Sequence, residues 1–305
     1  MKTSKRVTIF EGPDGAGKTT AALNYAERTN ARYVHFGPLP HVRTSLARVY
    51  VEAMLPALLG YQDVVLDRSW LSEYPYGTTF RATQPLRVSV VENSMLERIA
   101  LRCGAVVVKC LPDQNVVIEN FKQRRQIEML KNEADLKEVW LKYAWLDTDL
   151  PTIDHDYTIN SLDDLFANLE SLRLPTHPLC MNTAGNWYGD RVIVGDTLAE
   201  MKETDSFQQY PFVSFSQSGC SYWLTKQLVN WGTREHDICW INAADPGIRR
   251  FFEEEPDRRR VVIALGKQAA SKLIELGVNH VTVPHPQYQK RFNNMQEYSL
   301  RKLMC

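Results

Sequence analysis

The sequence predicts an α/β protein in two parts: a mostly parallel sheet with helices on both faces, and a second, smaller α/β domain. Short apolar runs alternate with segments of helical spacing up to Leu172, and this alternation is typical of parallel sheets. Pro, Gly, Asn and Thr then replace the periodic pattern over Leu174–Gly189, after which the alternation starts again. A chain of 305 residues is long enough for two hydrophobic cores.

The first domain is expected to span residues 1–174, and a glycine-rich turn joins its first strand to its first helix. The pattern predicts strands at Val7–Phe10, Val64–Leu66, Ala105–Leu111 and Tyr157–Ile159, helices over Thr20–Arg28, Leu86–Cys103 and Leu162–Leu172, and a helix-rich stretch over Gln114–Leu146.

Residues 175–189 are expected to form a linker, and residues 190–305 the second domain. Its pattern predicts strands at Val192–Val194, Ile238–Asn242, Val261–Leu265 and His280–Val283, and helices over Gly219–Trp231 and Lys267–Leu276.

Composition and charge exclude several classes of protein. Hydrophobic residues make up 44% and charged residues 24% of the chain, which excludes a disordered protein. Lys+Arg and Asp+Glu both number 36, so a nucleic-acid site would have to be a local patch. We find no apolar stretch long enough to span a membrane. The six cysteines are too far apart for C-x-x-C pairs, so we expect reduced thiols in a cytoplasmic protein.

A phosphate-binding loop (P-loop) follows the first predicted strand. Residues 12–19 fit the spacing G-x-x-x-x-G-K-[ST], between a strand and a helix as the motif requires. Backbone N–H groups of such a loop surround phosphates, and the helix N-terminus adds its positive dipole end. Lys18 would bridge the β- and γ-phosphates of ATP, while Thr19 would ligate Mg²⁺. The expected nucleotide-binding residues are Gly12, Asp14, Gly15, Ala16, Gly17, Lys18, Thr19 and Thr20.

The first domain resembles the thymidylate kinase-like family over roughly residues 5–172. Residues 10–20 read FEGPDGAGKTT, much as that family's loop does. Asp67-Arg68, at the end of a predicted strand, resembles the Asp-Arg pair of that family and of deoxynucleoside kinases. Residues 71–77 resemble its aromatic acceptor segment, and residues 123–128 fall where the family has an arginine-bearing lid.

The resemblance and the charges together suggest catalytic roles. Asp67 would hold Mg²⁺ directly or through water, and Arg68 would hold the acceptor or orient the transferred phosphate. Asp14 would accept a hydrogen bond from an acceptor hydroxyl. Arg124 and Arg125 are candidates for arginine fingers, or else lie on an exposed helix face. Phe36, Tyr74 and Tyr76 are candidates for stacking on a base, although single aromatic residues more often belong to a core.

Residues 192–292 resemble, more faintly, the uracil-DNA glycosylase superfamily. The similar segments are Val192–Asp196, Pro211-Phe212, Ile241–Ala243, Val261–Ala269 and Val283–Gln287. The resemblance implies that Asn242 and His285 contact a pyrimidine base. Gln287 stands where the family commonly has Ser, and the residues after Asp196 depart from its water-activating motif. A pocket for a base is therefore expected without evident water activation; a generic α/β domain with a histidine-containing loop is the alternative.

These features favour an ATP- and Mg²⁺-dependent P-loop kinase of a pyrimidine deoxynucleotide. Our preferred acceptor is the 5-hydroxymethyl group of hydroxymethyluracil in DNA, which related enzymes of bacterial viruses phosphorylate during thymine hypermodification. A base-reading domain suits such a polymer acceptor. The alternatives are a soluble thymidylate kinase and, from another class, a DNA glycosylase or a non-catalytic DNA-binding protein with a nucleotide switch. The expected location is cytoplasmic, in the host cytoplasm if the protein is viral.

Overall fold

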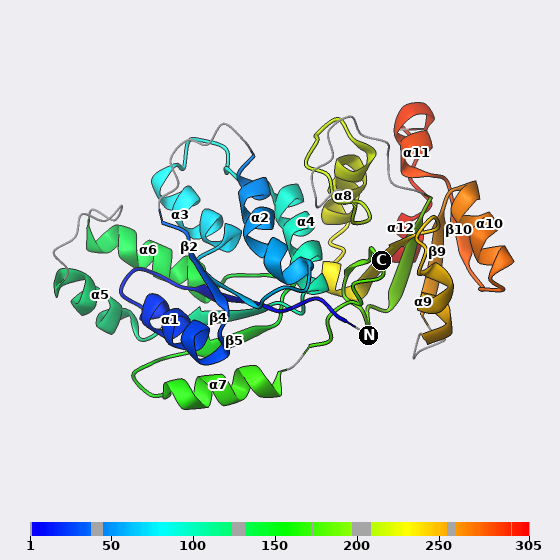
Figure 1. Ribbon diagram of the computed structural model, residues 1–305. Helices are drawn as coiled ribbons and strands as arrows, with labels where there is room; N and C mark the ends of the chain where they lie inside the picture. The colour runs from blue at the N-terminus through cyan, green and yellow to red at the C-terminus, as the bar shows by residue number, and fades with distance from the viewer. Residues whose placement is uncertain are drawn as a thin grey trace. The chain divides into compact units, whose positions relative to one another are not determined.

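The computed structural model describes residues 2–37, 45–123, 132–172, 174–196, 209–254, 260–293 and 295–304. Contacts within the chain divide it into two units (Figure 1). The N-terminal unit comprises Lys5–Ser89 and Cys103–Pro175; the C-terminal unit comprises Met1–Ser4, Val90–Arg102 and Thr176–Cys305. No helix of the described ranges is both long and apolar enough to cross a membrane.

The N-terminal unit is built on a five-stranded parallel sheet of strand order β2-β3-β1-β4-β5. The strands are β1 Val7–Glu11, β2 Arg32–His35, β3 Val64–Asp67, β4 Val106–Cys110 and β5 Thr152–His155. All five β1 residues are buried, as expected for a parallel strand covered on both faces. The predicted α/β fold class is thereby confirmed.

Helices cover both faces of this sheet, with α2 and α3 on one side and α7 on the other (Figure 1). The helices are α1 Lys18–Thr29, α2 Leu46–Leu58, α3 Glu73–Phe80, α5 Gln114–Gln123, α6 Glu133–Ala144 and α7 Leu162–Ser171, with a 3-10 turn η1 at Trp70–Ser72. One core cluster combines apolar residues of α1, α5, α6 and α7 with Phe10, Val65 and Val108 of the sheet. Because the β-strand period is two, these three side chains share one face.

The C-terminal unit has its own five-stranded sheet of order β10-β9-β7-β8-β6, parallel except for β6. Its strands are β6 Ala184–Gly185, β7 Arg191–Gly195, β8 Ile238–Asn242, β9 Val261–Leu265 and β10 Val281–Val283. Its helices are α4 Val90–Arg102, α8 Cys220–Asn230, α9 Ile248–Glu254, α10 Lys267–Glu275, α11 Pro286–Phe292 and α12 Arg301–Met304, with a 3-10 turn η2 at Glu235–Asp237. The second predicted sheet is therefore present.

The predicted strand at Tyr157–Ile159 is wrong. The last strand of the first sheet is β5, which pairs with β4 from Val107↔Thr152 to Cys110↔His155. Tyr157 instead begins a turn around Asp156, whose backbone carbonyl accepts hydrogen bonds from the N–H groups of Ile159 and Asn160. The Asp156 side chain also accepts from the N–H of Thr158 at 2.8 Å, which is typical of an Asx-turn.

Two segments differ from the sequence pattern. The predicted linker carries strand β6, whose Ala184 pairs with Trp240 of β8, and its His177 and Thr183 are fully buried. Helix α4 lies within the first stretch of sequence but packs in the C-terminal unit. Two of its arginines, Arg98 and Arg102, are 0% and 1% exposed and find their hydrogen-bond partners there, which explains why this helix belongs to the C-terminal unit.

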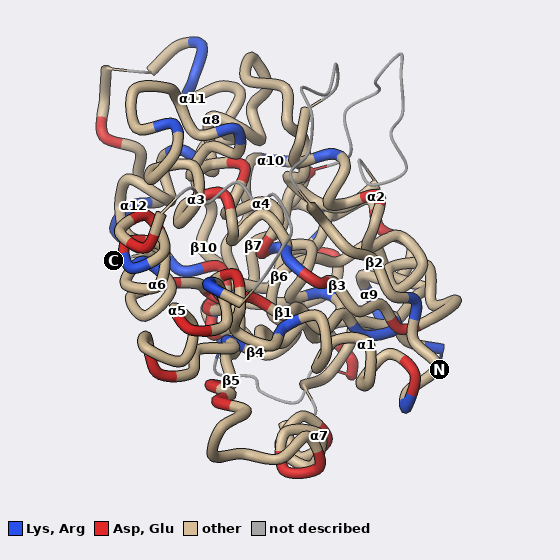
Figure 2. The backbone as a smooth tube through the Cα atoms, turned by 90° about the vertical axis from the view of Figure 1, so that its left-hand side faces the viewer, with Lys and Arg blue, Asp and Glu red and all other residues tan. Residues whose placement is uncertain are grey.

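Charged residues are interspersed along the described chain (Figure 2). This distribution agrees with the equal numbers of basic and acidic residues in the sequence. Any electrostatic feature that serves function is therefore local.

Candidate functional site

The P-loop lies between β1 and α1, as the motif requires, and close packing dictates its glycines. Gly12 has φ 146°, and a Cβ there would lie 2.1 Å from the backbone oxygen of Cys110 at the end of β4. Gly17 has φ 78°, and a Cβ there would lie 2.9 Å from the ring of Tyr157. Only glycine fits both positions, so the loop shape is fixed by the neighbouring strand end and turn.

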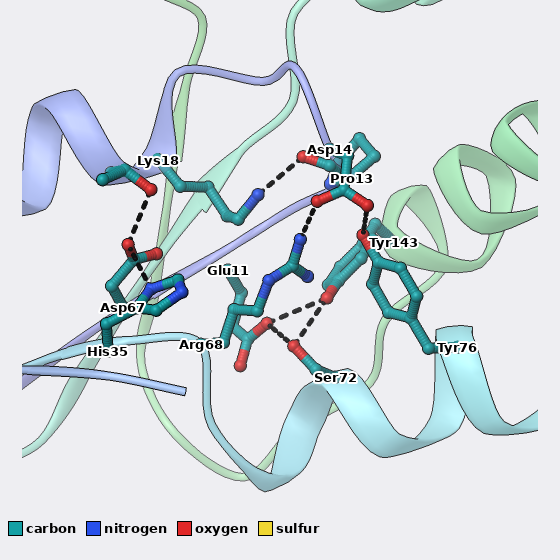
Figure 3. A network of polar contacts seen from close by, with 11 residues as sticks. Glu11, Pro13, Asp14, Lys18, His35, Asp67, Arg68, Ser72, Tyr76 and Tyr143 are labelled. Carbon is teal, nitrogen blue, oxygen red and sulfur yellow. Dashed lines mark hydrogen bonds and ion pairs between the residues drawn. The ribbon is translucent and has the colours of Figure 1, made fainter. Parts of the chain in front are cut away.

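Lys18 is the first residue of α1 and is only 5% exposed. Its ammonium group donates to the backbone oxygen of Pro13 at 2.6 Å, which folds the side chain back over the loop (Figure 3). Burial, and secondly the charge of Arg68, lowers the pKa of Lys18 to about 8. A buried cation held in this way would gain from a phosphate oxygen, because an anionic ligand adds negative charge that offsets the cost of burial.

Asp67 ends β3 and is fully buried at the P-loop. Its Oδ2 accepts hydrogen bonds from the Thr19 hydroxyl at 2.7 Å and the Tyr33 hydroxyl at 2.8 Å, and lies 2.9 Å from His35 Nδ1. Burial by itself would raise the pKa of Asp67, but these hydrogen bonds and the charge of Lys18 lower it. The group is thus a carboxylate at neutral pH.

The residues predicted to hold Mg²⁺ fit that ion. Asp67 Oδ1 is buried without a hydrogen-bond partner, and the Thr19 hydroxyl lies beside the same carboxylate. Within the described ranges, no three His, Cys, Asp or Glu side chains gather in a way that could hold a metal ion. Mg²⁺ typically keeps several waters and is bound by one or two carboxylates together with substrate phosphates, so a single buried carboxylate with a hydroxyl neighbour suits it.

A second cluster joins Asp14 of the P-loop to Arg68 and Tyr76. The Arg68 guanidinium forms an ion pair with Asp14 Oδ1, and the Tyr76 hydroxyl donates to Asp14 Oδ2 at 3.1 Å (Figure 3). The guanidinium also lies 4.6 Å from the centroid of the Tyr76 ring. Arg68 has φ 72°, a left-handed conformation that is costly for a non-glycine residue and concentrates at functional sites. The sequence-predicted Asp14, Arg68 and Tyr76 are thus brought together.

Sequence reasoning missed the acid beneath this cluster. Glu11 is fully buried at the end of β1 and accepts hydrogen bonds from the hydroxyls of Ser69 at 2.7 Å, Ser72 at 2.6 Å and Tyr143 at 3.0 Å. Burial raises the pKa of Glu11. An acidic residue that closes an apolar strand, directly before the P-loop, was a usable signal for Glu11. Tyr143 comes from α6, and no sequence pattern links it to the loop.

The remaining predicted residues that the structure describes in this unit take no part in these two clusters, although the N–H of Phe36 donates to the backbone oxygen of Asp67 at 2.9 Å. Phe36 is 7% exposed and its ring centroid lies 4.8 Å from that of Tyr50, so it packs in the core. Tyr74 is 51% exposed on α3, and Thr20 is exposed on α1. Arg124 and Arg125 lie outside the described residues.

In the C-terminal unit, polar and aromatic groups gather at the carboxyl ends of the parallel strands. A Cβ on Gly195, the last residue of β7, would lie 2.4 Å from Asn242 Oδ1 and 2.7 Å from the Phe212 ring. A Cβ on Gly266, after β9, would lie 3.0 Å from Asp196 Oδ2 and 3.1 Å from His285 Cβ. The absence of a side chain at both glycines therefore lets these neighbouring side chains pack directly against the backbone. Ligands of open α/β sheets bind at such strand ends.

Two of these groups have assigned hydrogen-bonding roles. Asp196 Oδ1 accepts from the N–H of Ala269 at 2.8 Å, in the first turn of α10, whose N-cap residue, Gly266, has no side chain to cap the helix. His285 Nδ1 accepts from the N–H of Gln287 at 3.2 Å, which leaves Nε2–H as the donor of the neutral ring. Burial lowers the pKa of His285, against the opposing effect of Asp196. His285 is thus neutral near pH 7.

No family model matches the sequence, and no curated protein matches it. Solved structures share its arrangement only distantly. The chain is similar to a YorR protein of Bacillus subtilis solved with phosphorylated GDP, at 21% identity over 54% of this chain and 94% of that one, with a TM-score of 0.41. A deoxyadenosine kinase of M. mycoides shows 14% identity over 55% of this chain and 100% of that one, with a TM-score of 0.36.

A thymidylate kinase of Candida albicans shows 14% identity over 56% of this chain and 92% of that one, with a TM-score of 0.35. The architecture described above rests on the chain's own strand order and contacts.

Proposed function

We propose that the protein is an ATP- and Mg²⁺-dependent phosphotransferase that acts on a pyrimidine deoxynucleotide. One observation carries the proposal: a P-loop with a buried lysine adjoins both a carboxylate–hydroxyl pair suited to Mg²⁺ and an Asp–Arg–Tyr cluster suited to an acceptor. The charges of Asp14, Arg68 and Asp67 all act on Lys18, so the two clusters share one electrostatic site. Phosphoryl transfer depends mainly on positioning and charge stabilisation, and this site supplies both.

The roles of the chain's residues follow from their places. P-loop N–H groups and Lys18 hold the β- and γ-phosphates, and Arg68 orients the transferred group. Bound Mg²⁺, held by Thr19 and Asp67, would neutralise phosphate charge. The acceptor hydroxyl oxygen forms a bond to the γ-phosphorus while the bond from that phosphorus to the β–γ bridging oxygen breaks and ADP leaves. Asp14 accepts the hydrogen bond of the hydroxyl and, when Arg68 turns from Asp14 to the transferred phosphoryl group, the proton of that hydroxyl.

We favour the 5-hydroxymethyl group of hydroxymethyluracil in DNA as the acceptor. The cluster of Phe212, Asn242 and His285 supports this choice, because an aromatic ring, an amide and a neutral Nε2–H are the groups that recognise a pyrimidine. Extruding a base from a duplex costs a few kcal/mol, which a second binding unit would offset. A free nucleotide needs no such unit.

We further propose that the C-terminal unit binds the base without cleaving its glycosidic bond. Asp196 stands where a water-activating residue would be expected, but one of its oxygens caps helix α10. A carboxylate tied to a helix N-terminus is a weaker base, since the N–H bond and the dipole both stabilise its charged form.

The test is incubation with γ-labelled ATP and Mg²⁺, offering thymidylate, hydroxymethyldeoxyuridylate and hydroxymethyluracil-containing DNA separately. We expect label on the DNA together with ADP release. Label on thymidylate alone would identify a soluble thymidylate kinase. Free base in place of labelled acceptor would identify a glycosylase, and neither product would identify a nucleotide-dependent binding protein.

A further inference from the structure

Helix α4 carries a buried arginine that is fully engaged within the C-terminal unit. Arg98 is 0% exposed, and its guanidinium donates to both oxygens of Glu235, at 2.9 Å from Nε and 2.6 Å from Nη2. It stacks 4.0 Å from the centroid of the Trp240 ring and also donates to the Thr225 hydroxyl at 3.2 Å. The ion pair is therefore bidentate and packs against the Trp240 ring.

The remaining amino group of Arg98 reaches the segment that carries Phe212. Nη1 donates to the Phe212 backbone oxygen at 2.6 Å. Phe212 has φ 54°, and a non-glycine residue persists in this left-handed conformation only where its surroundings hold it. The Phe212 ring reaches Gly195, next to Asn242, and its centroid lies 5.4 Å from that of Trp240. Trp240 thus contacts both the arginine and the aromatic ring.

We propose that Arg98 is a positioning residue, which holds Phe212 in its left-handed conformation so that the ring forms one wall of the pyrimidine pocket. This inference rests on the proposed base-binding role of the C-terminal unit. An apolar side chain would fill the same volume without the cost of burying a charge. The guanidinium can, however, bond both oxygens of a carboxylate through its planar fork and a backbone oxygen through its remaining amino group, an arrangement that an apolar residue cannot make and that the compact ammonium of lysine does not match.

Helix α4 belongs to the C-terminal unit but lies in sequence between two segments of the N-terminal unit. Its two ends continue into Ser89 and Cys103 of the N-terminal unit, so the residue that shapes the pocket comes from between two segments of the other unit. A fragment limited to residues 176–305 would lack Arg98 and would leave Glu235 buried without its ion-pair partner. The pocket is thus expected only in the full chain.

The test is a double-mutant cycle on the full-length protein. The affinity for a fluorescent single-stranded oligonucleotide with one hydroxymethyluracil is measured in wild type, Arg98→Lys, Phe212→Ala and the double variant. Stacking on an aromatic residue is worth about 1–3 kcal/mol per base, so we expect Phe212→Ala to weaken binding about 5- to 150-fold. Arg98→Lys should weaken it about fivefold in the Phe212 background and not at all in the Phe212→Ala background.

A matched control and a second variant separate positioning from folding. Phe251→Leu alters a fully buried core residue of α9 and should lower stability without changing the affinity. If Arg98→Lys unfolds, Arg98→Met/Glu235→Gln removes both charges and should show the same loss of affinity. Unchanged affinity in either folded Arg98 variant, or an equal loss in both Phe212 backgrounds, overturns the inference. If wild type does not bind the oligonucleotide, the proposed base-binding role fails as well.

Discussion

The two units build their candidate sites in opposite ways. In the N-terminal unit, Gly12, Asp14, Lys18 and Thr19 come from one loop and the start of one helix, and Asp67-Arg68 joins them from the neighbouring strand β3. In the C-terminal unit, the groups come singly from several strand ends. One of them, Phe212, is held by Arg98, which lies 114 positions earlier in the sequence. A short motif therefore reveals the first site, while only faint matches point to the second.

The two sites also differ in charge. Lysine, arginine and three carboxylates act on one another around the P-loop, as suits a ligand with several negative charges. The C-terminal cluster holds one carboxylate, Asp196, which caps α10; its other groups are an aromatic ring, an amide and a histidine that burial keeps neutral. Neutral groups suit recognition of an uncharged base, which agrees with the proposal that the first unit carries the chemistry and the second unit recognises the base.

Among the substitutions that test this division between the units, Lys18→Ala should have the largest effect on phosphoryl transfer. The variant should lose phosphoryl transfer about 10²-fold or more on every acceptor, because no other group replaces the buried cation at the phosphates. Folding should persist, since the desolvation of Lys18 disappears with its charge. Labelled-phosphate assays and thermal unfolding measure the two effects, with the exposed Lys122→Ala as control. Turnover above about a tenth of wild type would contradict the role.

Asp67→Asn should slow turnover about 10²-fold and weaken the dependence on Mg²⁺. The amide removes the negative charge that Asp67 Oδ1, which has no hydrogen-bond partner, would offer to the cation. A Mg²⁺ titration of the rate measures the change, and Asp154→Asn, on the exposed side of β5, is the control. An unchanged titration would remove Asp67 from the surroundings of the metal.

Arg68→Ala should lower kcat/KM for the acceptor about 10- to 100-fold, the usual worth of a hydrogen bond to a charged group. The KM for ATP should change less, because Lys18 and the P-loop remain. Initial rates with each substrate varied in turn give both constants. Combining Arg68→Ala with Asp14→Asn should cost less than the sum of the single changes, since the residues form one ion pair; strict additivity would argue against a shared role.

The smallest effect concerns stability rather than turnover. Burial raises the pKa of Glu11 above its ordinary value of 4.5. Its contribution to stability is therefore complete below pH 4.5 and is lost as pH rises through the higher pKa of the folded protein. Relative to Glu11→Gln, the unfolding free energy of wild type should fall by up to about 1.4 kcal/mol per pH unit in that window.

Chemical unfolding at several pH values measures this slope. Glu119→Gln, whose side chain is 63% exposed, should follow wild type. Parallel pH profiles for wild type and Glu11→Gln would show that Glu11 is not held in a desolvated site.

Sequence patterns predicted most of the fold because strand and helix periodicities are local. Strands β8 and β9 lie where predicted, and α7 and α10 differ from prediction by one residue at the C-terminal end. The predicted strand at Tyr157–Ile159 failed because Asp156 forms a local turn, but two other differences depend on partners distant in sequence. Strand β6 forms because β8 offers it an edge, and α4 joins the C-terminal unit through buried arginines, whose polar character resembles a surface helix.

In the candidate sites, too, residues adjacent in sequence were easier to predict than residues brought together by packing. The P-loop and Asp67-Arg68 are contiguous motifs and could be predicted residue by residue. Glu11 and Tyr143 meet only after β1 and α6 pack together. Phe36 shows the converse, since an aromatic residue next to a site can belong wholly to the core.

The position of α4 makes point substitutions easier to interpret than a truncation of the chain. A truncation near Leu174 would expose the Arg98 and Arg102 side chains of α4, which are buried in the C-terminal unit. Loss of activity in such a fragment would reflect damage to α4 as much as loss of base recognition. Point substitutions at the pocket avoid this ambiguity.

The most direct measurement is the ratio of phosphorylation of hydroxymethyluracil-containing DNA to that of hydroxymethyldeoxyuridylate, in wild type and in Asn242→Ala. Asn242 is 6% exposed at the end of β8, so it belongs to the C-terminal cluster and not to the P-loop site. We predict that the variant loses about tenfold in turnover on DNA, the worth of one or two hydrogen bonds, and keeps its turnover on the free nucleotide. Equal loss on both acceptors, or no loss on DNA, would contradict the account.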